Sequence, residues 1–367
     1  MRKSLSRDWD ELSRRHAAFW QCAETDRPLV VVLYQAYQDT TLVAAAFGEG
    51  ELLPERVDPA PILAVYDQMA AAHEQIGDDF VAAGEALLGI PWLEAICGCR
   101  VQVPDGKSLW PETPAGGWAI SRIDFSTSNP WFQSLLRVVQ SVVRHAAGRY
   151  PVSMSHLRGP TDVLAALLGS QTFLTGLIDE PERMKQLALQ VAEVYLQVAR
   201  AQEALIPDFR GGYAIRQFGL WSSGRSVWLQ DDTSSMMSLR MYRQVFIEPM
   251  TRMSGFPYGV LHLHAPSLHL AETLAGVPNI RTINVYFDSP TTTLEKAFPV
   301  LRRLQAMKMP LILTQEVYQG FSMDEYRLIL ENLSPAGLSV HLQAGSITEG
   351  QALMAKVNEL ANGLKTI

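Results

Sequence analysis

Several features that are common in proteins are scarce in this chain. Only three of its 367 residues are cysteines (Cys22, Cys97 and Cys99), too few for a disulfide framework. The 31 basic and 38 acidic residues give a formal charge of -7 without any block of like charges, which disfavours a nucleic-acid ligand. No uninterrupted apolar run approaches the roughly 20 residues that cross a bilayer, so no membrane span is expected.

The beginning of the chain is equally unlike a secretory signal. Residues 1–16 read MRKSLSRDWDELSRRH, which is polar where a signal peptide needs an apolar stretch. Together with the small number of cysteines, this predicts a protein of the reducing cytoplasm. The sequence also has no glycine-rich phosphate loop between a strand and a helix, and therefore no nucleotide-binding fingerprint.

Apolar residues, by contrast, are abundant and occur in a repeating order. They make up 47% of the chain, enough for a large core. Short β-rich runs alternate with long amphipathic stretches, which is typical of βα units around a parallel sheet. Nine runs are predicted strands: 28–35, 78–84, 151–157, 211–217, 226–230, 259–264, 280–287, 310–317 and 338–343.

This order predicts an α/β fold, a (β/α)8 TIM barrel formed by residues 1–367 as a single domain, although nine strands are one more than a barrel needs. The clearest predicted helix spans 181–205 and starts with a proline after two acidic residues. From residue 259 onward, strands alternate regularly with helices closed by glycine or proline. The Pro-, Gly- and Trp-rich stretch 97–130 breaks this rhythm and is predicted to be a long inserted loop.

Histidines in two of the predicted strands point to chemistry. In a parallel barrel the carboxyl ends of the strands converge on one mouth. His262 and His264 end one run on the same side of its strand, and His341 lies in the last run, 77 residues after His264. If the strands are as predicted, three imidazoles can meet near the mouth.

Three neutral imidazoles with an open fourth position suit a catalytic Zn²⁺ ion. Such an ion lowers the pKa of a bound water or thiol, or polarises a substrate oxygen. In the alternative without a metal, His262 and His264 form hydrogen bonds inside the barrel and His341 contacts an anionic substrate. Because H-x-H recurs often by chance, the spacing alone leaves both interpretations open.

Several stretches together resemble the uroporphyrinogen decarboxylase superfamily. They are RPLVVVLYQAYQ (27–38), GIPWLEAICGCRV (89–101), SHLRGPTDVLAALLG (155–169), LQDDTSSMMSLRMYRQVFIEPM (229–250) and LHLHAPSLHLAETLAGVPNI (261–280). The resemblance implies a single (β/α)8 barrel and a homodimer. The superfamily includes both the haem-pathway decarboxylases and the zinc methyltransferases that serve corrinoid proteins.

The chain departs from the decarboxylase pattern after its first predicted strand. The decarboxylases carry Arg-Gln-Ala-Gly-Arg there, and the two arginines hold carboxylates of the substrate. Residues 34–38 read Tyr-Gln-Ala-Tyr-Gln instead, so both cations are missing. A porphyrinogen with eight acid side chains is therefore a disfavoured substrate.

The zinc methyltransferases bind their metal through His-x-Cys on one strand and a Cys on the last. The matching positions here read His262, His264 and His341, so the resemblance implies a metal site in which imidazoles replace both thiolates. Three histidines leave a dipositive centre, better suited to polarising oxygen or ionising water than to holding a nucleophilic thiolate. We therefore expect a small methylated substrate, with methoxy compounds among the candidates, rather than a thiol acceptor.

Acidic side chains near the predicted mouth are candidates for catalysis. Asp232, at the end of its predicted strand, could orient a ligand histidine or cap the next helix. Glu316 is a candidate fourth ligand or general base, with a solvated loop acid as the alternative. Glu85 competes with Asp79 for a role in proton handling near the second strand, where the decarboxylases keep an aspartate.

The predicted substrate contacts are polar and aromatic. Arg158 and Arg216 each end a strand and could hold an anionic group, or lie at the rim without a ligand. The dense aromatic side chains suit an aromatic or otherwise hydrophobic substrate, although barrel cores use the same residues. The candidate contacts are Tyr34, Tyr37, Trp92, Arg158, Arg216, Gln230 and Tyr286. The thiols of the C-x-C pair at 97–99 are expected to be packing groups.

Three functional hypotheses follow. The first is a metal-dependent methyltransferase that moves a methyl group between a small substrate and a corrinoid on a partner protein. The second is a metal-free, decarboxylase-like enzyme for a small carboxylic acid, in which His341 stabilises charge and Glu85 or Asp232 handles the proton. The third is a barrel without chemistry that binds a hydrophobic metabolite.

Overall fold

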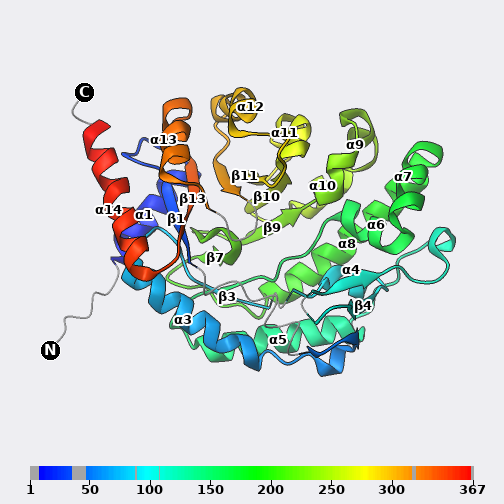
Figure 1. The fold of residues 1–367 in the computed structure, drawn as a ribbon. Helices are drawn as coiled ribbons and strands as arrows, with labels where there is room; N and C mark the ends of the chain where they lie inside the picture. The colour runs from blue at the N-terminus through cyan, green and yellow to red at the C-terminus, as the bar shows by residue number, and fades with distance from the viewer. Residues whose placement is uncertain (1–7, 35–46, 87–88, 107, 316–319, 365–367) are drawn as a thin grey trace.

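A parallel six-stranded sheet forms the centre of the fold (Figure 1). The computed structural model describes residues 8–34, 47–86, 89–106, 108–315 and 320–364. The sheet order is β1, β13, β12, β11, β10, β9, and every neighbouring pair is parallel. The strands are β1 Leu29–Tyr34, β9 Ser226–Gln230, β10 Tyr258–His264, β11 Ile280–Phe287, β12 Leu311–Gln315 and β13 Leu338–Ala344. All six match predicted strands, and the α/β class is confirmed.

The C-terminal third follows the predicted βα order closely. Helices α11 Leu268–Leu274, α12 Leu294–Ala306 and α13 Met323–Asn332 connect the successive strands from β10 to β13, and they lie together along one side of the sheet (Figure 1). A capping box starts α13: the Ser322 hydroxyl accepts from the Glu325 N–H (3.2 Å), and the Glu325 carboxylate accepts from the Ser322 N–H (2.8 Å). Local signals therefore define these units well.

The predicted strand 78–84 forms a ladder only at its end. There β3 (Gly84–Glu85) pairs in parallel with β6 (Val152–Ser153), which is also shorter than predicted. Further upstream, the side chains of Asp78 and Asp79 accept the N–H groups of Val32 and Val30, both at 2.8 Å. These carboxylates, together with a backbone bond from the Asp79 N–H to the Val30 carbonyl (2.9 Å), connect the segment to β1, so it is extended without being a regular strand.

The predicted strand 211–217 does not join the parallel set. It contains β7 (Tyr213–Ile215), which pairs antiparallel with β8 (Leu220–Ser222) in a tight hairpin. Gly219 turns the hairpin at φ +60°, and a Cβ there would lie 2.2 Å from the Phe80 ring. This hairpin accounts for the one predicted strand beyond the eight that a barrel needs. The described strands fall into four separate sheets, so closure into a barrel is not shown by the part of the chain that the structure describes.

The predicted inserted loop at 97–130 interrupts the βα order, as expected, but it carries secondary structure. Its strands β4 (Arg100–Val103) and β5 (Trp110–Glu112) form an antiparallel sheet with β2 (Gly50–Leu52), and the 3-10 helix η3 spans Gly117–Ala119. Because β2 lies about fifty residues upstream, no local pattern in the loop reveals this pairing.

The remaining helices surround the strands. In Figure 1, α3 and α5 lie on the side of the molecule opposite α11 to α13. The helices are α1 Trp9–Trp20, α3 Ala60–Ile76, α4 Trp92–Ile96, α5 Pro130–Ala146, α6 Pro160–Leu168, α7 Ser170–Asp179, α8 Pro181–Glu203, α9 Leu239–Val245, α10 Ile247–Met253 and α14 Ile347–Leu364, with 3-10 helices η2 Pro54–Arg56, η4 Arg216–Phe218, η5 Asp232–Met236 and η6 Ala265–Ser267. Helix α8 confirms the prediction for 181–205.

Among the described residues no single helix is long and apolar enough to cross a membrane, and only α6 and α7, bent by 111° at their junction, pass that test as a pair.

Candidate functional site

Asp232, His262 and His264 converge where β9 and β10 end. His262 and His264 point to the same face of β10, and Asp232 begins η5 directly after β9, the neighbouring strand. Asp232 Oδ1 lies 3.2 Å from His264 Nε2 and 3.7 Å from His262 Nε2, and the ligand atoms of all three residues are within 4.8 Å of one another. Ligand atoms on a tetrahedral ion with bonds of about 2.0–2.1 Å are roughly 3.3 Å apart, so this spacing suits a metal.

The hydrogen bonds of Asn284 determine which nitrogen of His262 can bind a metal. The Asn284 amide donates to the Ile312 carbonyl (3.1 Å) and the Thr314 hydroxyl (3.0 Å). Its oxygen therefore accepts from His262 Nδ1 at 2.5 Å, which leaves the Nε2 lone pair facing the group. Burial lowers the pKa of His262 and so favours the neutral, metal-binding form.

His264 lies between two carboxylates. Its Nδ1 is 2.6 Å from Asp288 Oδ2, and its Nε2 faces Asp232. Burial alone would lower the pKa of His264, but the hydrogen bond with Asp232 and the charges of Asp232 and Asp288 raise it to about 9. Without a metal this imidazole is therefore protonated at neutral pH. With a metal, Asp288 would accept from Nδ1–H and orient the ring, as carboxylates do behind metal-binding histidines.

The two carboxylate oxygens of Asp232 have different surroundings. Its Oδ2 accepts a hydrogen bond from the Gln230 amide, whereas the buried Oδ1 faces two imidazole nitrogens, 3.2 Å from His264 Nε2 and 3.7 Å from His262 Nε2. Burial opposes ionisation of Asp232, but the hydrogen bond with His264 and the charges of His262 and His264 hold its pKa below the usual range. An ionised, buried oxygen between two imidazole nitrogens is a group that a cation would satisfy.

Two reciprocal caps fix the position of Asp232. Asp162 of α6 accepts from the Asp232 N–H (3.0 Å), the Thr233 N–H (2.8 Å) and the Thr233 hydroxyl (2.6 Å). In return, Asp231 accepts from the N–H and the hydroxyl of Thr161 at the start of α6 (3.2 and 2.5 Å). The interpretation of Asp232 as a helix cap is therefore wrong: Asp162 caps η5, and the Asp232 side chain is free to face the histidines.

His341 does not join the group, contrary to the predicted three-histidine site. It is buried in β13 beside Asp78, His73 and the backbone of Phe218, and burial lowers its pKa to about 3. Two strands separate β13 from β10, and three strand spacings of about 4.8 Å make roughly 14 Å along the sheet. Strand β9 is adjacent to β10, so Asp232, which follows β9, lies near the two histidines. Asp232 is therefore the third member of the group, a position predicted for His341 from the sequence.

The two acids that compete near the second predicted strand have different roles. Asp79 pairs with Arg15 Nε (2.8 Å) and with Arg27, and these charges lower its pKa although burial opposes this. Glu85 is buried in the interior, where burial raises its pKa to about 6 against the opposing charge of Arg216. Asp79 is therefore a structural residue, and Glu85 stays a candidate for catalysis or substrate binding.

The other predicted contacts are dispersed. Tyr286 borders the group, with its ring centroid 5.4 Å from that of His262 and 5.2 Å from that of His264. Arg158 pairs with the buried Glu94 at 3.1 Å. Trp92 is a core residue, fully buried with its indole N–H bonded to the Ala86 carbonyl. Tyr34 is half-buried at the end of β1, and Tyr37 and Glu316 lie outside the described residues.

The thiols of Cys97 and Cys99 are packing groups, as expected. Burial raises the pKa of Cys99 to about 12, and the nearby Glu94 adds to the shift. Burial likewise raises the pKa of Cys97 well above its usual value.

Sequence reasoning missed Asn284 and Asp288, which orient the two histidines. In the parallel ladder His262 lies opposite Asn284, and His264 lies opposite Tyr286, two residues before Asp288. Their signal was present in the sequence as polar residues in and just after an apolar strand. It could be interpreted only with the knowledge that β10 and β11 are neighbours in this register.

Replacement of Asn284 by alanine is expected to lower the affinity for a divalent metal by roughly 10- to 100-fold, the usual cost of losing a residue that orients a ligand. The change removes the acceptor that holds the His262 proton on Nδ1. A chelator competition assay measures the affinity. Asn332→Ala is a control that should bind metal like the wild type, because Asn332 ends α13 and bonds to Arg302 rather than to a member of the group.

The metal-free protein should lose stability as the pH rises through about 9. The pKa of His264 is raised on folding, so its contribution is fully present below its ordinary pKa of about 6.5 and disappears above the folded value. Urea unfolding between pH 6 and 10, with a chelator present, measures this slope. The free energy of unfolding of His264→Gln should lack this dependence on pH. An equal pH dependence in the wild type and in the variant would contradict the prediction.

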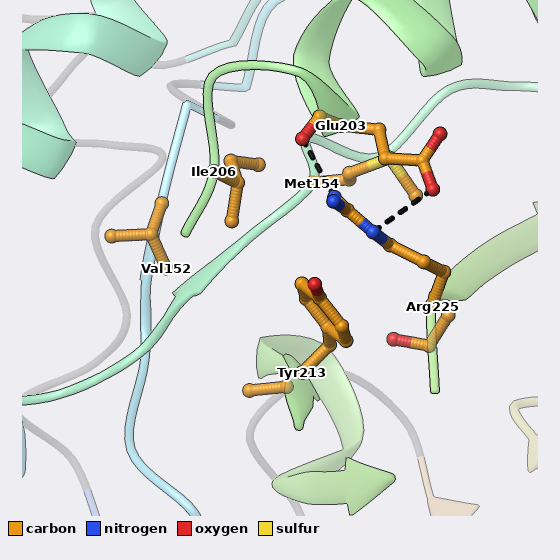
Figure 2. Close-up of a pocket in the computed structure, with 8 residues that line it drawn as sticks. Val152, Met154, Glu203, Ile206, Tyr213 and Arg225 are labelled. Carbon is orange, nitrogen blue, oxygen red and sulfur yellow. Dashed lines mark hydrogen bonds and ion pairs between the residues drawn. The ribbon is translucent and has the colours of Figure 1, made fainter. Parts of the chain in front are cut away.

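The hollow drawn in Figure 2 is separate from this group. Val152, Met154, Ile206 and Tyr213 line it together with Arg225 and Glu203, which bond to each other. Arg225 precedes β9, whereas Asp232 follows that strand. None of the residues that line the hollow belongs to the group of Asp232, His262 and His264.

Comparison with known proteins identifies a similar fold. No protein-family model matches the sequence, and no curated protein matches it. Among solved structures, the chain is similar to a methyltransferase from Methanosarcina mazei, with a TM-score of 0.64 and 14% sequence identity over 95% of this chain and 98% of the other. At this identity the likeness shows a shared fold.

Proposed function

We propose that the chain is a metal-dependent methyltransferase of the uroporphyrinogen decarboxylase superfamily, with a small methylated substrate and a corrinoid protein as its partner. The observation that carries the proposal is the group of Asp232, His262 and His264, whose ligand atoms have the spacing of a metal site. The fold shared with a methyltransferase supports it. The proposal includes a single (β/α)8 barrel domain that forms a homodimer in the cytoplasm.

Asp232 and the Nε2 atoms of His262 and His264 would hold the metal, for which we propose Zn²⁺. When bound, the metal supplies Lewis acidity that polarises a substrate oxygen. Two imidazoles and one carboxylate leave a net positive charge on a divalent ion, unlike a site with two thiolates. We therefore infer an oxygen-linked methyl group, as in a methoxy compound, as the group transferred.

The residues around the group prepare it for this chemistry. Asn284 and Asp288 hold the imidazole protons on Nδ1, and the Gln230 amide orients Asp232. The ring of Trp228 lies 6.1 Å from that of His262, and the ring of Tyr286 lies 5.4 Å from that of His262 and 5.2 Å from that of His264. These aromatic side chains supply apolar surface for the methyl group and for the substrate that carries it. They also exclude water from the metal-binding group.

Metal analysis followed by a transfer assay tests the proposal. Protein purified without a histidine tag and incubated with Zn²⁺, Fe²⁺ or Mn²⁺ should retain one ion per chain. The loaded protein should then move labelled methyl from a methoxy compound to reduced cobalamin. The metal site would be rejected if the wild-type protein retained none of the three ions and so did not differ from the Asp232→Ala variant.

Glu85 favours a second candidate function, a metal-free enzyme for a small carboxylic acid. With its pKa raised to about 6 by burial, Glu85 can exchange a proton near neutral pH. Loss of CO₂ from such an acid, undiminished by a chelator but abolished in Glu85→Gln, would support this function over methyl transfer.

A further inference from the structure

The buried pair of Glu85 and Arg216 is incompletely bonded. Glu85 Oε1 accepts from the His156 N–H at 2.8 Å, but Oε2 has no hydrogen-bond partner within the part of the chain that the structure describes and lies 3.7 Å from Arg216 Nη1. Arg216 Nε is likewise buried without a partner among these residues, and the two side chains are 1% and 12% exposed. An arginine and a carboxylate in full contact form short paired bonds of about 2.7–2.9 Å. Among the described residues this pair leaves one carboxylate acceptor and one guanidinium donor open.

The ion pair of Arg225 and Glu203 in Figure 2 is a more closely bonded arginine–carboxylate pair in the same protein. Arg225 donates from Nη1 to the Glu203 carbonyl at 2.7 Å, and its Nε lies 3.1 Å from Glu203 Oε1. That pair is also more exposed, at 36% and 25%. The Arg225–Glu203 pair thus differs from the pair of Glu85 and Arg216, in which the described residues leave one atom of the carboxylate and one of the guanidinium open. In the pair of Arg158 and the buried Glu94, Glu94 Oε2 is open as well. Such buried open atoms are costly because water reaches them less easily.

The chemistry of the two open atoms restricts what can bind between them. A group there has to donate to Glu85 Oε2 and accept from Arg216 Nε. A carboxylate only accepts and would be repelled by Glu85, whereas an ammonium only donates and would be repelled by Arg216. A hydroxyl does both, and it is neutral.

The pair is connected to the metal-binding group through packed rings. His156, whose N–H binds Glu85, stacks on Trp228 with the ring centroids 3.9 Å apart. Trp228 in turn packs against His262. Glu85 ends β3, and Arg216 directly follows β7.

We propose that Glu85 and Arg216 form a subsite for a hydroxyl group of the substrate, which makes the methyl donor a neutral hydroxylated methoxy compound. The inference rests on the proposed function for the methyl group only. The open donor of Arg216 and the open acceptor of Glu85 hold the hydroxyl. The aromatic rings between the subsite and the metal-binding group favour a substrate with a planar ring. The subsite selects the substrate and takes no part in the transfer itself.

Binding of two matched probes to the zinc-loaded protein tests the subsite. 2-Methoxyphenol carries the hydroxyl, and 1,2-dimethoxybenzene has the same shape with the hydroxyl capped. Calorimetry should show that the wild type binds the phenol roughly 10- to 100-fold more tightly, the difference expected for hydrogen bonds to charged groups. The anion 2-methoxybenzoate should bind more weakly than the phenol because Glu85 repels it.

Three variants locate the preference. Glu85→Gln can keep the acceptor for the His156 N–H while its amide replaces the open oxygen, so the preference should fall below about threefold. Arg216→Lys retains the charge, loses Nε and should show the same fall. Glu203→Gln alters the pair in Figure 2 and should keep the wild-type preference.

The inference is overturned if the wild type does not distinguish the probes, if it binds neither, or if both Glu85→Gln and Arg216→Lys keep the preference, in which case a water fills the gap. Its failure is distinguishable from failure of the proposed function. A protein that retains zinc but shows no preference rejects the subsite alone, whereas one that prefers the phenol but retains no metal rejects methyl transfer alone.

Discussion

Replacement of Asp232 by alanine should lower the affinity for Zn²⁺ by more than about 100-fold. The change removes the one negatively charged ligand of the group, and even residues that only orient a ligand contribute about 10- to 100-fold. Asp232→Asn should have nearly the same effect, because it keeps the shape but removes the charge. Competition with a chromophoric chelator at pH 7.5 measures the affinity of each purified variant.

His341→Asn is the matched control for this prediction. His341 is a buried strand histidine like His262, but it lies apart from the group, so its replacement should leave the zinc affinity within about threefold of the wild type. Equal losses of zinc in the His341 and Asp232 variants would instead support the three-histidine site inferred from the sequence and reject the arrangement described above.

Replacement of Asp79 by asparagine should reduce the free energy of unfolding by roughly 3–5 kcal/mol, the usual cost of removing one partner of a buried ion pair. Asp79 is buried and holds Arg15, Arg27 and the N–H of Val30. In the variant Arg27 loses its buried counter-charge, and Arg15 keeps only the more exposed Asp26 among the described residues, although the two side chains are only 11% and 15% exposed. Urea unfolding at pH 7 measures the difference.

Asp26→Asn provides the control, because Asp26 is a more exposed partner of Arg15 at 3.4 Å and should contribute less than about 1 kcal/mol. Acid unfolding gives an independent measurement. The pKa of Asp79 is lowered on folding, so its stabilisation is present above the ordinary aspartate pKa of about 3.9 and is lost as the pH falls toward the folded value. Identical acid transitions for wild type and Asp79→Asn would contradict the assignment.

The candidate site could be predicted in part. Alternation along 259–264 placed His262 and His264 on one face, because the side-chain direction in a strand depends only on local geometry. The polar end of 226–230 indicated Asp232. The pairing of these two segments was not predictable, since it depends on β9 and β10 being neighbours in one sheet. For the same reason His341 was wrongly included: its orientation was a local property, but its distance from β10 was not.

The sequence by itself determined the elements with strong local signals, such as the parallel strands from β9 to β13 and the long helix α8, because apolar periodicity and capping residues act over a few positions. The tertiary structure alone decided that 211–217 folds into a hairpin and that the side chains of Asp78 and Asp79 bond to the backbone of β1. It also decided that Asp162 caps η5 and frees the side chain of Asp232. The carboxylate bonds and the cap join residues about fifty or more positions apart, and the hairpin turn at Gly219 lies against Phe80, which is also distant in the sequence. Such contacts form only when the chain is packed, and no pattern within one segment specifies them.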